Sequence, residues 1–468
     1  MTLKALLVSA AVIAVPVSGP ANAQLRPDQT AFRAIFKELV ETNTTLSAGS
    51  CTIAAAQLGA RLKAAGFKDS DITLFSVPEH PKEGGIVAIL PGSDKAAKPI
   101  LLLGHLDVVE AKREDWTRDP FVLVEENGYL YGRGTFDDKA QAAIFTDTFI
   151  RYKKAGKSPR RTLKLALTCG EETTFAFNGA DWLAKNRAAL IAAEYAINEG
   201  GGGRYDPAGK PQALGVQVGE KTVQNYKLEA TNPGGHSSVP RPDNAITDLA
   251  RALVKVNTHE FPVQFNDTTR TFFTTIAKST PAPVSAAITA LLANPKDNPA
   301  SVLLSQDPTF HSTLRTTCVA TLVEAGHANN ALAQRATSNV NCRLFPGTDP
   351  EQTRADLVAA IGDPRVAVTL TAPVRPIAAP PPLNPAVIGP MRTLADKHFP
   401  GVPFSLTMST GATDAIFLAP VGIPTYGAPG LFIDSDGNGI HGLNERIRIK
   451  SLMDGRDYLD DLVHTLAD

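Results

Sequence analysis

Cysteine is scarce in this chain, and its spacing excludes a thiolate metal site. The 468 residues include four cysteines, Cys51, Cys169, Cys318 and Cys342. No two of them have the Cys-x-x-Cys spacing of a zinc or redox centre, and four are too few for a disulfide framework in a chain of this length. Export would permit one or two bridges, whose pairing the sequence does not decide. Burial as small apolar side chains is the commoner role of such residues.

Net charge and long apolar runs are also scarce. Lysine and arginine number 46 against 47 aspartates and glutamates, so the formal net charge is −1. This balance implies no polyanionic partner, and we expect no nucleic-acid binding. Beyond the N-terminal region, no stretch reaches the ~20 apolar residues of a membrane-spanning helix. The composition is that of a large globular protein, and ~150 residues per domain predicts two or three domains.

The first 23 residues have the layout of a secretory signal peptide. One lysine precedes an apolar run over residues 5–17, and the small residues Ala21 and Ala23 follow before Gln24. This charged, apolar and small order is typical of a cleaved signal, and the run is too short to span a membrane. We therefore expect cleavage near Ala23 and a secreted or periplasmic protein with no stable membrane anchor. The alternative is a buried N-terminal helix.

Strand-like and helical patterns alternate over the first 219 residues. Short apolar runs lie at 86–90, 100–103, 163–168 and 195–197, and helical patterns at 29–40, 53–65, 139–154 and 180–193. This alternation predicts an α/β fold in which helices cover both faces of a largely parallel sheet. Ligands in such folds gather beyond the carboxyl ends of strands. His105, Glu171 and Glu199 each follow a strand-like run.

The pattern changes near Gly219. Strands are predicted at 223–230, 316–322, 337–344 and 366–371, and helices at 244–256 and 350–361. Their order predicts a compact ferredoxin-like α+β module inserted into the first domain. We therefore expect a signal peptide (1–23), a first catalytic part (24–219), an inserted domain (220–374) and a second catalytic part (375–468). Within the insert, residues 279–306 are weakly patterned, with one short helix at 284–293.

Histidines and acids recur at positions that suit a metal site. They are His105 and Asp107 in GHLDVV, Asp137 in YGRGTFDDKA, the adjacent Glu171 and Glu172, Glu199 in NEGGGG and His441 in GIHGLNERI. Neutral imidazoles and carboxylates that converge at strand ends are zinc ligands. A general base must stand beside the attacking water without being used as a ligand, and an adjacent glutamate pair permits that division. The set predicts a metal-dependent hydrolase.

A series of segments, in this order, resembles the co-catalytic dinuclear-zinc exopeptidase and deacylase family. The segments are GHLDVV, WTRDPF, LYGRGTFDDKA, CGEET, NEGG, PGGHSS, NCRLFPG, STGATDA and GIHGLNE. The family includes carboxypeptidase G, aminoacylase, succinyl-diaminopimelate desuccinylase, carnosinase and yeast carboxypeptidase S. The resemblance covers nearly the whole mature chain. It implies a mixed sheet flanked by helices, of the zinc-exopeptidase type, with an inserted lid and dimerisation domain through which a homodimer would form.

The resemblance also implies two divalent metal ions and their ligands. Asp137 would bridge the two ions. Glu172 and His441 would complete one ligand set, and His105 and Glu199 would complete the other. Zinc is the expected ion, with manganese and cobalt as alternatives because carboxylate-rich sites accept them.

Two further acids and one peptide bond have roles by resemblance. Asp107 would orient the ring of His105 and raise its basicity. Glu171 would be the general base. The peptide bond after Asp137 would be cis, and Asp138 would belong to the local structure at the start of the following helix.

Four positions match those that hold the substrate in the family. His236 in PGGHSS would supply a donor from the inserted domain, in many dimeric relatives across the subunit interface. Asn330, Arg343 and Gly411 would hold the substrate's carboxylate and backbone, although Asn330 read alone is a turn former and Arg343 a surface arginine. A guanidinium fork suits a free carboxylate, which favours exopeptidase action. Arg375 is not included in this set, because its setting is rich in proline.

These residues predict cleavage of an amide bond in a short peptide or an N-acyl amino acid with a free C-terminal carboxylate. A dedicated N-acyl amino acid deacylase is the alternative among enzymes, and Glu199, in place of the aspartate of some relatives, resembles the aminoacylase side of the family. A peptide-binding protein without activity is the alternative from another class. The complete ligand set and Glu171 argue against it, because a binder has no use for a proton shuttle.

Overall fold

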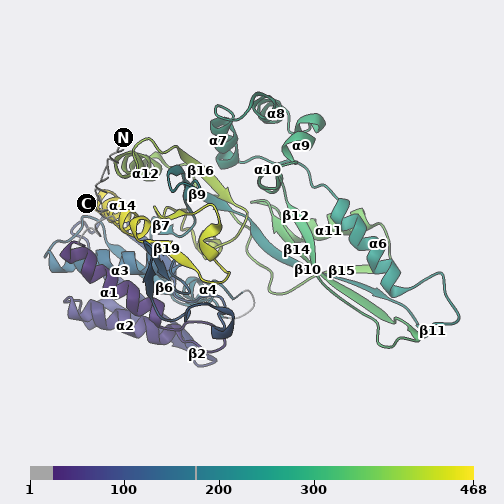
Figure 1. Cartoon of the computed structure of the whole chain (residues 1–468), viewed down its shortest axis with the longest axis horizontal. Coiled ribbons are helices and arrows are strands. Elements are labelled where there is room, and N and C mark those ends of the chain that lie inside the picture. The colour runs from purple at the N-terminus through teal and green to yellow at the C-terminus, as the bar shows by residue number, and fades with distance from the viewer. Residues whose placement is uncertain (1–24, 174–176) are drawn as a thin grey trace, which may run out of the picture.

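The computed structural model describes residues 25–173 and 177–468. The predicted signal peptide lies outside the described residues. Figure 1 shows a lobe of helices packed around a large sheet, a second and elongated lobe built on a smaller sheet, and a group of short helices between them. In the part of the chain that is described, no helix is both long and apolar enough to cross a membrane.

The first lobe is built on a mixed ten-stranded sheet. In order across the sheet its strands are β1 (Ile72–Val77), β2 (His80–Leu90), β6 (Leu163–Thr168), β3 (Ile100–His105), β7 (Tyr195–Asn198), β17 (Thr425–Gly427), β9 (Pro211–Glu220), β8 (Gly201–Tyr205) and β18 (Phe432–Ile433), with β16 (Phe404–Ser409) paired to β9. The central strands β6, β3, β7 and β17 are parallel, and so are the outer pairs β16–β9 and β18–β8. The pairs β1–β2, β2–β6, β17–β9 and β8–β9 are antiparallel. The sheet is therefore mixed, and the expectation of a largely parallel sheet holds for its centre and for two outer pairs.

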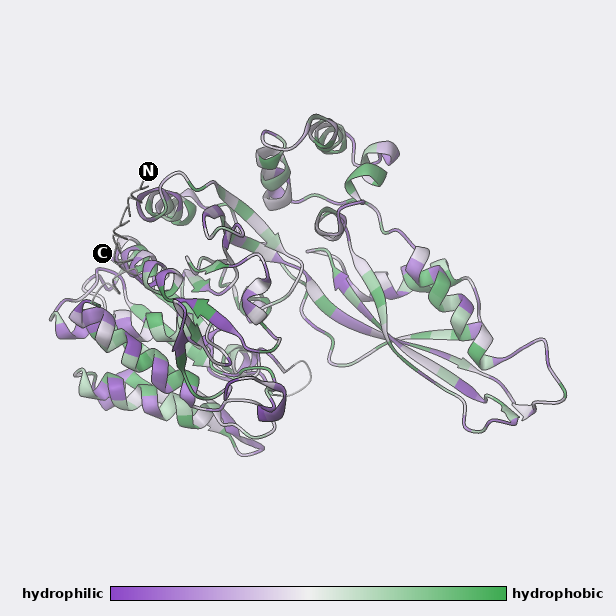
Figure 2. Ribbon diagram, viewed as in Figure 1, coloured by the Kyte–Doolittle hydropathy of each residue, from purple (hydrophilic) through white to green (hydrophobic). Residues whose placement is uncertain are grey.

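Helices cover both faces of this sheet. One face carries α1 (Pro27–Glu41), α2 (Cys51–Ala64), α3 (Lys139–Lys154), α12 (Pro385–His398) and α14 (Ile449–Ala467), and the other carries α4 (Gly179–Asn186), α5 (Ala188–Ile191) and α13 (Ala415–Leu418). Leu102 and Leu165 pack into the first core and Leu101 and Ala166 into the second. Because both faces are covered, β3 is buried along its whole length and is apolar from Ile100 to Leu103. Figure 2 shows hydrophobic and hydrophilic residues mixed along the helices of this lobe, as expected for helices with one face on a sheet and the other in solvent. A small sheet of β4 (Val124–Glu126), β5 (Tyr129–Tyr131) and β19 (Arg446–Arg448) lies beside this layer.

The second lobe has the predicted strand and helix order. Its antiparallel sheet has the order β12 (Thr317–Ala325), β14 (Arg335–Leu344), β10 (Thr222–Thr231) and β15 (Val366–Leu370), and α6 (Ala245–Thr258) and α11 (Pro350–Ile361) share a core with it. The short pair β11 (Gly235–His236) and β13 (Ala331–Leu332) forms the far tip (Figure 1). These elements lie within residues 220–374; the domain boundaries stay a prediction.

A group of four short helices stands where the sequence predicted a single one. These are α7 (Asp267–Ile276), α8 (Ala282–Ala293), α9 (Asn298–Leu304) and α10 (Pro308–Thr313), and they enclose a small core of their own that includes Phe273 and Ile288. Side chains of Asn266, Asp297 and Asp307 cap three of the helix starts. Helices this short span only two or three turns, so their apolar spacing is too brief to be recognised as a helical period.

All four cysteines form disulfides. Cys51, at the start of α2, is bonded to Cys169, the residue after β6, with a sequence separation of 118. Cys318 and Cys342 lie opposite each other on β12 and β14, with a separation of 24. The role as unpaired apolar residues was therefore wrong. The first bond ties helix α2 to the segment that holds Glu171 and Glu172.

The two bonds are expected to stabilise the fold unequally. In the chain-entropy model, a closed loop of 118 residues contributes about 5 kcal/mol and one of 24 residues about 3 kcal/mol. Thermal unfolding of a Cys51→Ala/Cys169→Ala variant should therefore begin at a lower temperature than that of Cys318→Ala/Cys342→Ala. Equal shifts, or the reverse order, would contradict the loop argument.

Candidate metal centre and substrate cleft

The parallel core of the sheet brings the predicted metal ligands to one edge. His105 ends β3, Glu171 and Glu172 follow β6 by a short turn, and Glu199 follows β7. Because these strands are parallel neighbours, their carboxyl ends open on the same side of the sheet. The sequence argument for a site at this edge agrees with the arrangement observed.

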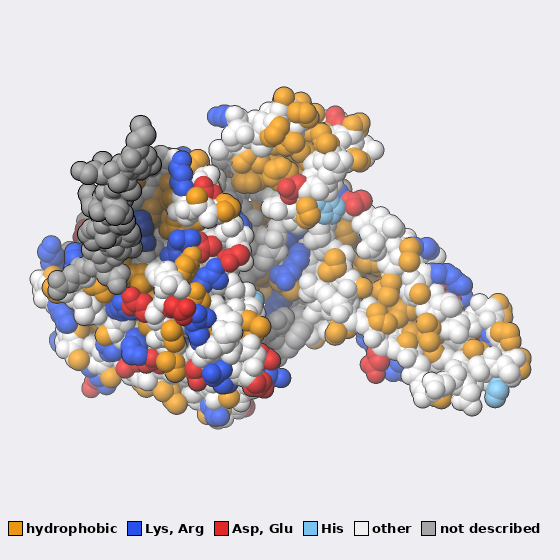
Figure 3. Space-filling model, in the orientation of Figure 1, with side chains coloured by type: hydrophobic (Ala, Val, Ile, Leu, Met, Phe, Trp, Pro, Cys, Tyr) orange, Lys and Arg blue, Asp and Glu red, His pale blue; other side chains and the backbone are white. Residues whose placement is uncertain are grey.

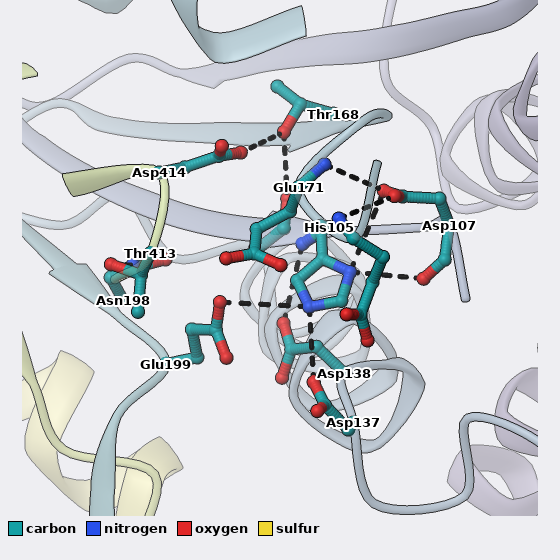
Figure 4. Close-up of polar contacts among 12 residues, drawn as sticks. His105, Asp107, Asp137, Asp138, Thr168, Glu171, Asn198, Glu199, Thr413 and Asp414 are labelled. Carbon is teal, nitrogen blue, oxygen red and sulfur yellow. Dashed lines mark hydrogen bonds and ion pairs between the residues drawn. The ribbon is translucent and has the colours of Figure 1, made fainter. Parts of the chain in front are cut away.

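The first predicted ligand set comes together around His105. Its Nε2 atom lies 3.2 Å from Asp137 Oδ1 and 3.6 Å from Glu199 Oε1. Ligand atoms of all three residues lie within 4.8 Å of one another. The ring of His105 is 1% exposed, and Figure 4 shows both carboxylates pointing toward it.

The second predicted set comes together around His441. Its Nε2 atom lies 3.1 Å from Asp137 Oδ2 and 2.9 Å from Glu172 Oε1. Asp137 thus turns one carboxylate oxygen toward each histidine, which is the arrangement a bridging ligand needs. The Asp137–Asp138 peptide bond is cis, as the resemblance implied. The ligand roles themselves stay a prediction.

Asp107 holds the glutamate pair as well as the histidine. The ring Nδ1 of His105 contacts the backbone oxygen of Asp107 at 3.0 Å and its carboxylate at 3.6 Å. The same carboxylate accepts the backbone N–H of Glu172 at 2.9 Å and that of Glu171 at 3.4 Å. The residue predicted to orient the imidazole therefore also orients the segment that carries the predicted base.

Glu171 lies beside both sets. Burial raises the pKa of its carboxyl well above the usual value, and the same is true of Glu199. His105, Glu171 and Glu172 also meet the distance criterion for a ligand group, so proximity alone does not separate a base from a ligand here. The Cys51, Asp107 and Cys169 group also meets it, but its sulfurs are used in a disulfide.

The donor chemistry fits divalent cations. Two imidazoles and four carboxylates converge in a small volume, where His105 is buried, the acids are half-buried and His441 is exposed, and an uncompensated group of acids is costly in such a place. Imidazole nitrogen and carboxylate oxygen are the ligand types of zinc, manganese and cobalt sites.

Glu445 was missed in the sequence and holds the loop of Asp137. It is 1% exposed, and its Oε1 accepts the backbone N–H groups of Phe136 and Asp137 at 2.9 and 3.2 Å. Its Oε2 pairs with Arg133 at 2.7 Å, and Arg133 also donates to the backbone oxygen of Gly442, next to His441. The signal was present, because Glu445 stands in the same GIHGLNE segment as His441.

A cleft of ≈420 Å³ runs from these residues to the second lobe. Glu171, Glu172 and His441 line one side, and the predicted substrate residues Arg343 and Gly411 line it too. Figure 3 shows the molecule hollowed between the two lobes. The cleft therefore lies between the predicted metal ligands of the first lobe and the guanidinium of Arg343 on the second lobe.

Two arginines face this cleft. Arg343 on β14 is partly buried, and its side chain makes no hydrogen bond or ion pair with any residue that the structure describes. Arg375, which sequence reasoning set aside, lies with its guanidinium 5.4 Å from the ring centre of Phe417, another lining residue. Its proline-rich segment is the strap that returns the chain to the first lobe, and only the fold reveals that the strap borders the cleft.

His236 and Asn330 are not brought to the cleft of their own chain. Both are exposed at the tip of the second lobe, where the N–H of Ser237 donates to the backbone oxygen of Asn330 at 3.0 Å. The tip lies at the end of the molecule opposite the first lobe (Figure 1). Within one chain, these two predicted substrate residues and the metal ligands are separate.

Residues 101–465 match the family model described as "Peptidase family M20/M25/M40". The chain belongs to this family. It is therefore a metal-dependent hydrolase, and one structural neighbour, the YXEP protein of Bacillus subtilis, is described as a dinuclear metal binding peptidase of the M20 family, with a TM-score of 0.58 and 11% identity over 94% of this chain and 98% of that one.

Members of the M20 family align with most of the chain. Human N-fatty-acyl-amino acid synthase/hydrolase PM20D1 is 28% identical over 91% of this chain and 86% of its own length. A probable carboxypeptidase S-like protein of Dictyostelium discoideum is 29% identical over 80% of this chain and 72% of its own. The solved Sso-CP2 metallo-carboxypeptidase of Sulfolobus solfataricus has a TM-score of 0.69 at 19% identity, covering 94% of this chain and 99% of that one. Human carnosine dipeptidase 1 has a TM-score of 0.66 at 15% identity, covering 94% and 96%. These last two likenesses show the shared fold.

The number of metal ions bound should distinguish Asp137, predicted to bridge both ions, from His441, predicted to bind one ion of this M20 protein. In a two-metal site the wild-type chain should bind about two ions, His441→Ala about one and Asp137→Ala close to none. His464→Ala, near the C-terminus and outside both sets, is the control and should match the wild type. Metal analysis by mass spectrometry checks this; equal losses in His441→Ala and Asp137→Ala would remove the bridging role.

Proposed function

We propose that this protein is a secreted or periplasmic hydrolase with two divalent metal ions, expected to be zinc. It would cleave the amide bond of short peptides or N-acyl amino acids that end in a free carboxylate. The observation that carries the proposal is Asp137, whose two oxygens face two histidine-containing sets beside Glu171. The cleft at this site also holds the guanidinium of Arg343, which has no hydrogen bond or ion pair to the described residues.

The cleft supports a small substrate with one anionic end. Its ≈420 Å³ lies in the size range of small-molecule sites. Arg343 would form a fork of hydrogen bonds with the terminal carboxylate of the substrate. A charge-assisted pair of this kind favours exopeptidase or deacylase action, because an internal peptide bond has no carboxylate beside it.

The chain's own residues divide the work of hydrolysis. Bound metal ions would lower the pKa of water and polarise the scissile carbonyl group. Glu171 would take a proton as water attacks the amide carbon, and would pass it to the leaving amine. Burial raises the pKa of its carboxyl, which favours uptake of the proton from the attacking water. Asp107 would hold Glu171 and His105 in position, through the backbone N–H of Glu171 and the ring Nδ1 of His105.

The disulfides support an exported protein. Bonds of this kind persist in oxidising compartments and are rare in the cytosol. Both bonds tie strands or helices of the folded lobes, and residues 1–23 have the order of a signal peptide. The two observations are independent, and both point to secretion or the periplasm.

An exposed sheet edge supports a homodimer. Strand β12 is an edge of the second sheet, and Val319, Leu322 and Val323 on it are 57%, 69% and 62% exposed. Apolar edges of this kind are covered in stable proteins. A second copy seated here would bury them, and its tip would supply His236 and Asn330 to the cleft that lacks them.

A dedicated N-acyl amino acid deacylase is the second candidate. It is favoured by the PM20D1 relative, which is named an N-fatty-acyl-amino acid synthase/hydrolase and aligns with 91% of this chain. The two candidates differ in whether the group on the carbonyl side of the scissile bond is an acyl chain or an aminoacyl residue, since both release an amino acid from the amine side.

A substrate mixture tests the proposal and separates the candidates. Metal-loaded wild type, Glu171→Gln and a chelated sample would each be exposed to dipeptides, N-acyl amino acids of several chain lengths, and the carboxamides of both. Mass spectrometry should record consumption by the loaded wild type alone, sparing the carboxamides. Glu171→Gln should keep its metal and lose roughly 10²–10⁴-fold in rate, because only the proton acceptor is removed.

Three outcomes of this mixture would count against the proposal. No consumption with metal bound would overturn hydrolysis of this substrate class. Equal turnover of the carboxamides would remove the role of Arg343. A Glu171→Gln protein that lacks metal would make Glu171 a ligand.

Mixing two inactive variants tests the dimer. His236→Ala should lose activity if its side chain serves the partner's cleft, and Glu171→Gln loses its own base. In mixed dimers, one cleft combines an intact Glu171 with the other chain's His236, so about a quarter of all sites should recover activity. If mixed dimers form and activity still does not return, His236 does not contribute to the cleft of the partner chain.

A further inference from the structure

The chain crosses between the lobes at two buried charged residues. Glu220 ends β9 in the first lobe and is 5% exposed, and Lys221 follows it and is 0% exposed. Lys221 reaches toward the second lobe, where its Nζ donates to the backbone oxygen of Arg315 at 2.6 Å. Glu220 reaches the other way, toward the loop of residues 409–414.

Glu220 and Lys221 hold this loop at both ends. Glu220 Oε2 accepts the hydroxyl of Thr413 at 2.8 Å and the backbone N–H of Thr413 at 3.1 Å. The side chain of Gln217 also donates to this oxygen, at 3.0 Å. At the start of the loop, the backbone N–H of Lys221 donates to the oxygen of Ser409 at 3.1 Å.

The held loop forms part of the cleft. Residues 411–414 all line it. The hydroxyl of Thr413 also accepts the amide of Asn198 at 3.1 Å, and Asn198 directly precedes the predicted ligand Glu199. Asp414 accepts the hydroxyl of Thr168, at the end of β6, at 3.0 Å. Figure 4 shows Thr413, Asn198 and Asp414 side by side at this edge of the site.

Burying the carboxyl group of Glu220 lowers the stability of the fold, so packing alone does not explain an acid at this position. Burial raises the pKa of Glu220 to about 8, and no ion pair to it is formed by the residues that the structure describes. An amide or apolar residue would fill the space at lower cost. A cavity of ≈30 Å³ lies beside Glu220, Gln217 and Thr425. The side chain of Glu220 is therefore not there to fill the space completely.

We propose that Glu220 is a positioning residue for the substrate. Through Thr413 it holds the 409–414 loop where Gly411 and its neighbours meet the bound molecule, and through Asn198 it ties that loop to the strand end that carries Glu199. The proposal rests on the proposed function of the cleft and adds to it a residue outside the metal and substrate sets. The group that matters is the acceptor oxygen of Glu220.

Three variants separate this role from ordinary burial. Glu220→Gln keeps a carbonyl oxygen that can accept from Thr413. Glu220→Leu fills similar space without an acceptor. Thr268→Val is the matched control, because Thr268 donates to the backbone oxygen of Val218 at 2.7 Å. It therefore removes a buried hydrogen bond from the same strand, two residues before Glu220, and leaves the loop untouched.

Hydrogen exchange of the full-length protein tests the positioning without any substrate. In the peptide that covers residues 405–416, Glu220→Leu should exchange roughly tenfold faster, a factor that corresponds to about 1.4 kcal/mol, since both hydrogen bonds from Thr413 to Glu220 are lost. Glu220→Gln and Thr268→Val should match the wild type in that peptide. Should Glu220→Leu not fold, Thr413→Val removes the hydroxyl bond to Glu220, keeps the backbone N–H bond, and should loosen the same peptide to a smaller extent. Unchanged exchange in the variant that folds would overturn the proposal.

Kinetics tests the consequence for the substrate. With unchanged metal content, Glu220→Leu should lower kcat/KM roughly 10²-fold, mostly through a higher KM, because a small displacement of binding groups is costly. Glu220→Gln should restore it to within about threefold. A Gln variant as damaged as the Leu variant, or an equal loss in Thr268→Val, would overturn the positioning role. A wild type inactive on every substrate would instead overturn the proposed function, and the exchange experiment would still decide the role of Glu220.

Discussion

Hydrogen bonds from backbone N–H groups to buried carboxylates are the interaction on which this centre depends. Asp107 accepts from the segment of Glu171 and Glu172, and Glu445 from the loop of Asp137. Asp138 accepts from His105. Each carboxylate accepts its hydrogen bonds from a neighbouring segment of backbone, and these bonds fix the segments relative to one another. A group of metal-binding carboxylates would otherwise repel one another and spread apart.

The two lobes contribute opposite charges to one cleft. The first lobe presents acids at the ends of parallel strands, where the fold leaves a natural opening. The second lobe presents Arg343 from the middle of an antiparallel sheet, held by its neighbours on β10 and β12. A substrate with a scissile amide near a free carboxylate matches this separation of charge. The tip of the same lobe, with His236 and Asn330, points away and suits a second copy.

Prediction from the sequence worked best where local pattern and burial agree. The ranges predicted for β6 and α3 match the structure because uninterrupted burial and a long helical period leave a clear signal. One predicted helix at 180–193 is instead two, α4 and α5, separated at Arg187. Of the four helices of residues 267–313 only α8 was predicted, since the other three are shorter than the window in which a period can be recognised. The antiparallel pairs of the large sheet, β1 with β2 and β8 with β9 among them, were missed because strand direction depends on the partner that each strand finds in the fold.

The sequence by itself determined the class of reaction and predicted which residues would carry it. Histidines and acids in distinctive segments, in a fixed order, identify a metal-dependent hydrolase, because few residue types can bind a metal or move a proton. Tertiary structure alone decided how the four cysteines pair and that Asp137 faces both histidines. It also showed that Arg375 borders the cleft, that Glu445 and Glu220 hold its loops, and that His236 lies far from it. The reason is physical: residue identity sets what a side chain can bind, whereas distances between segments hundreds of residues apart arise only when the lobes pack.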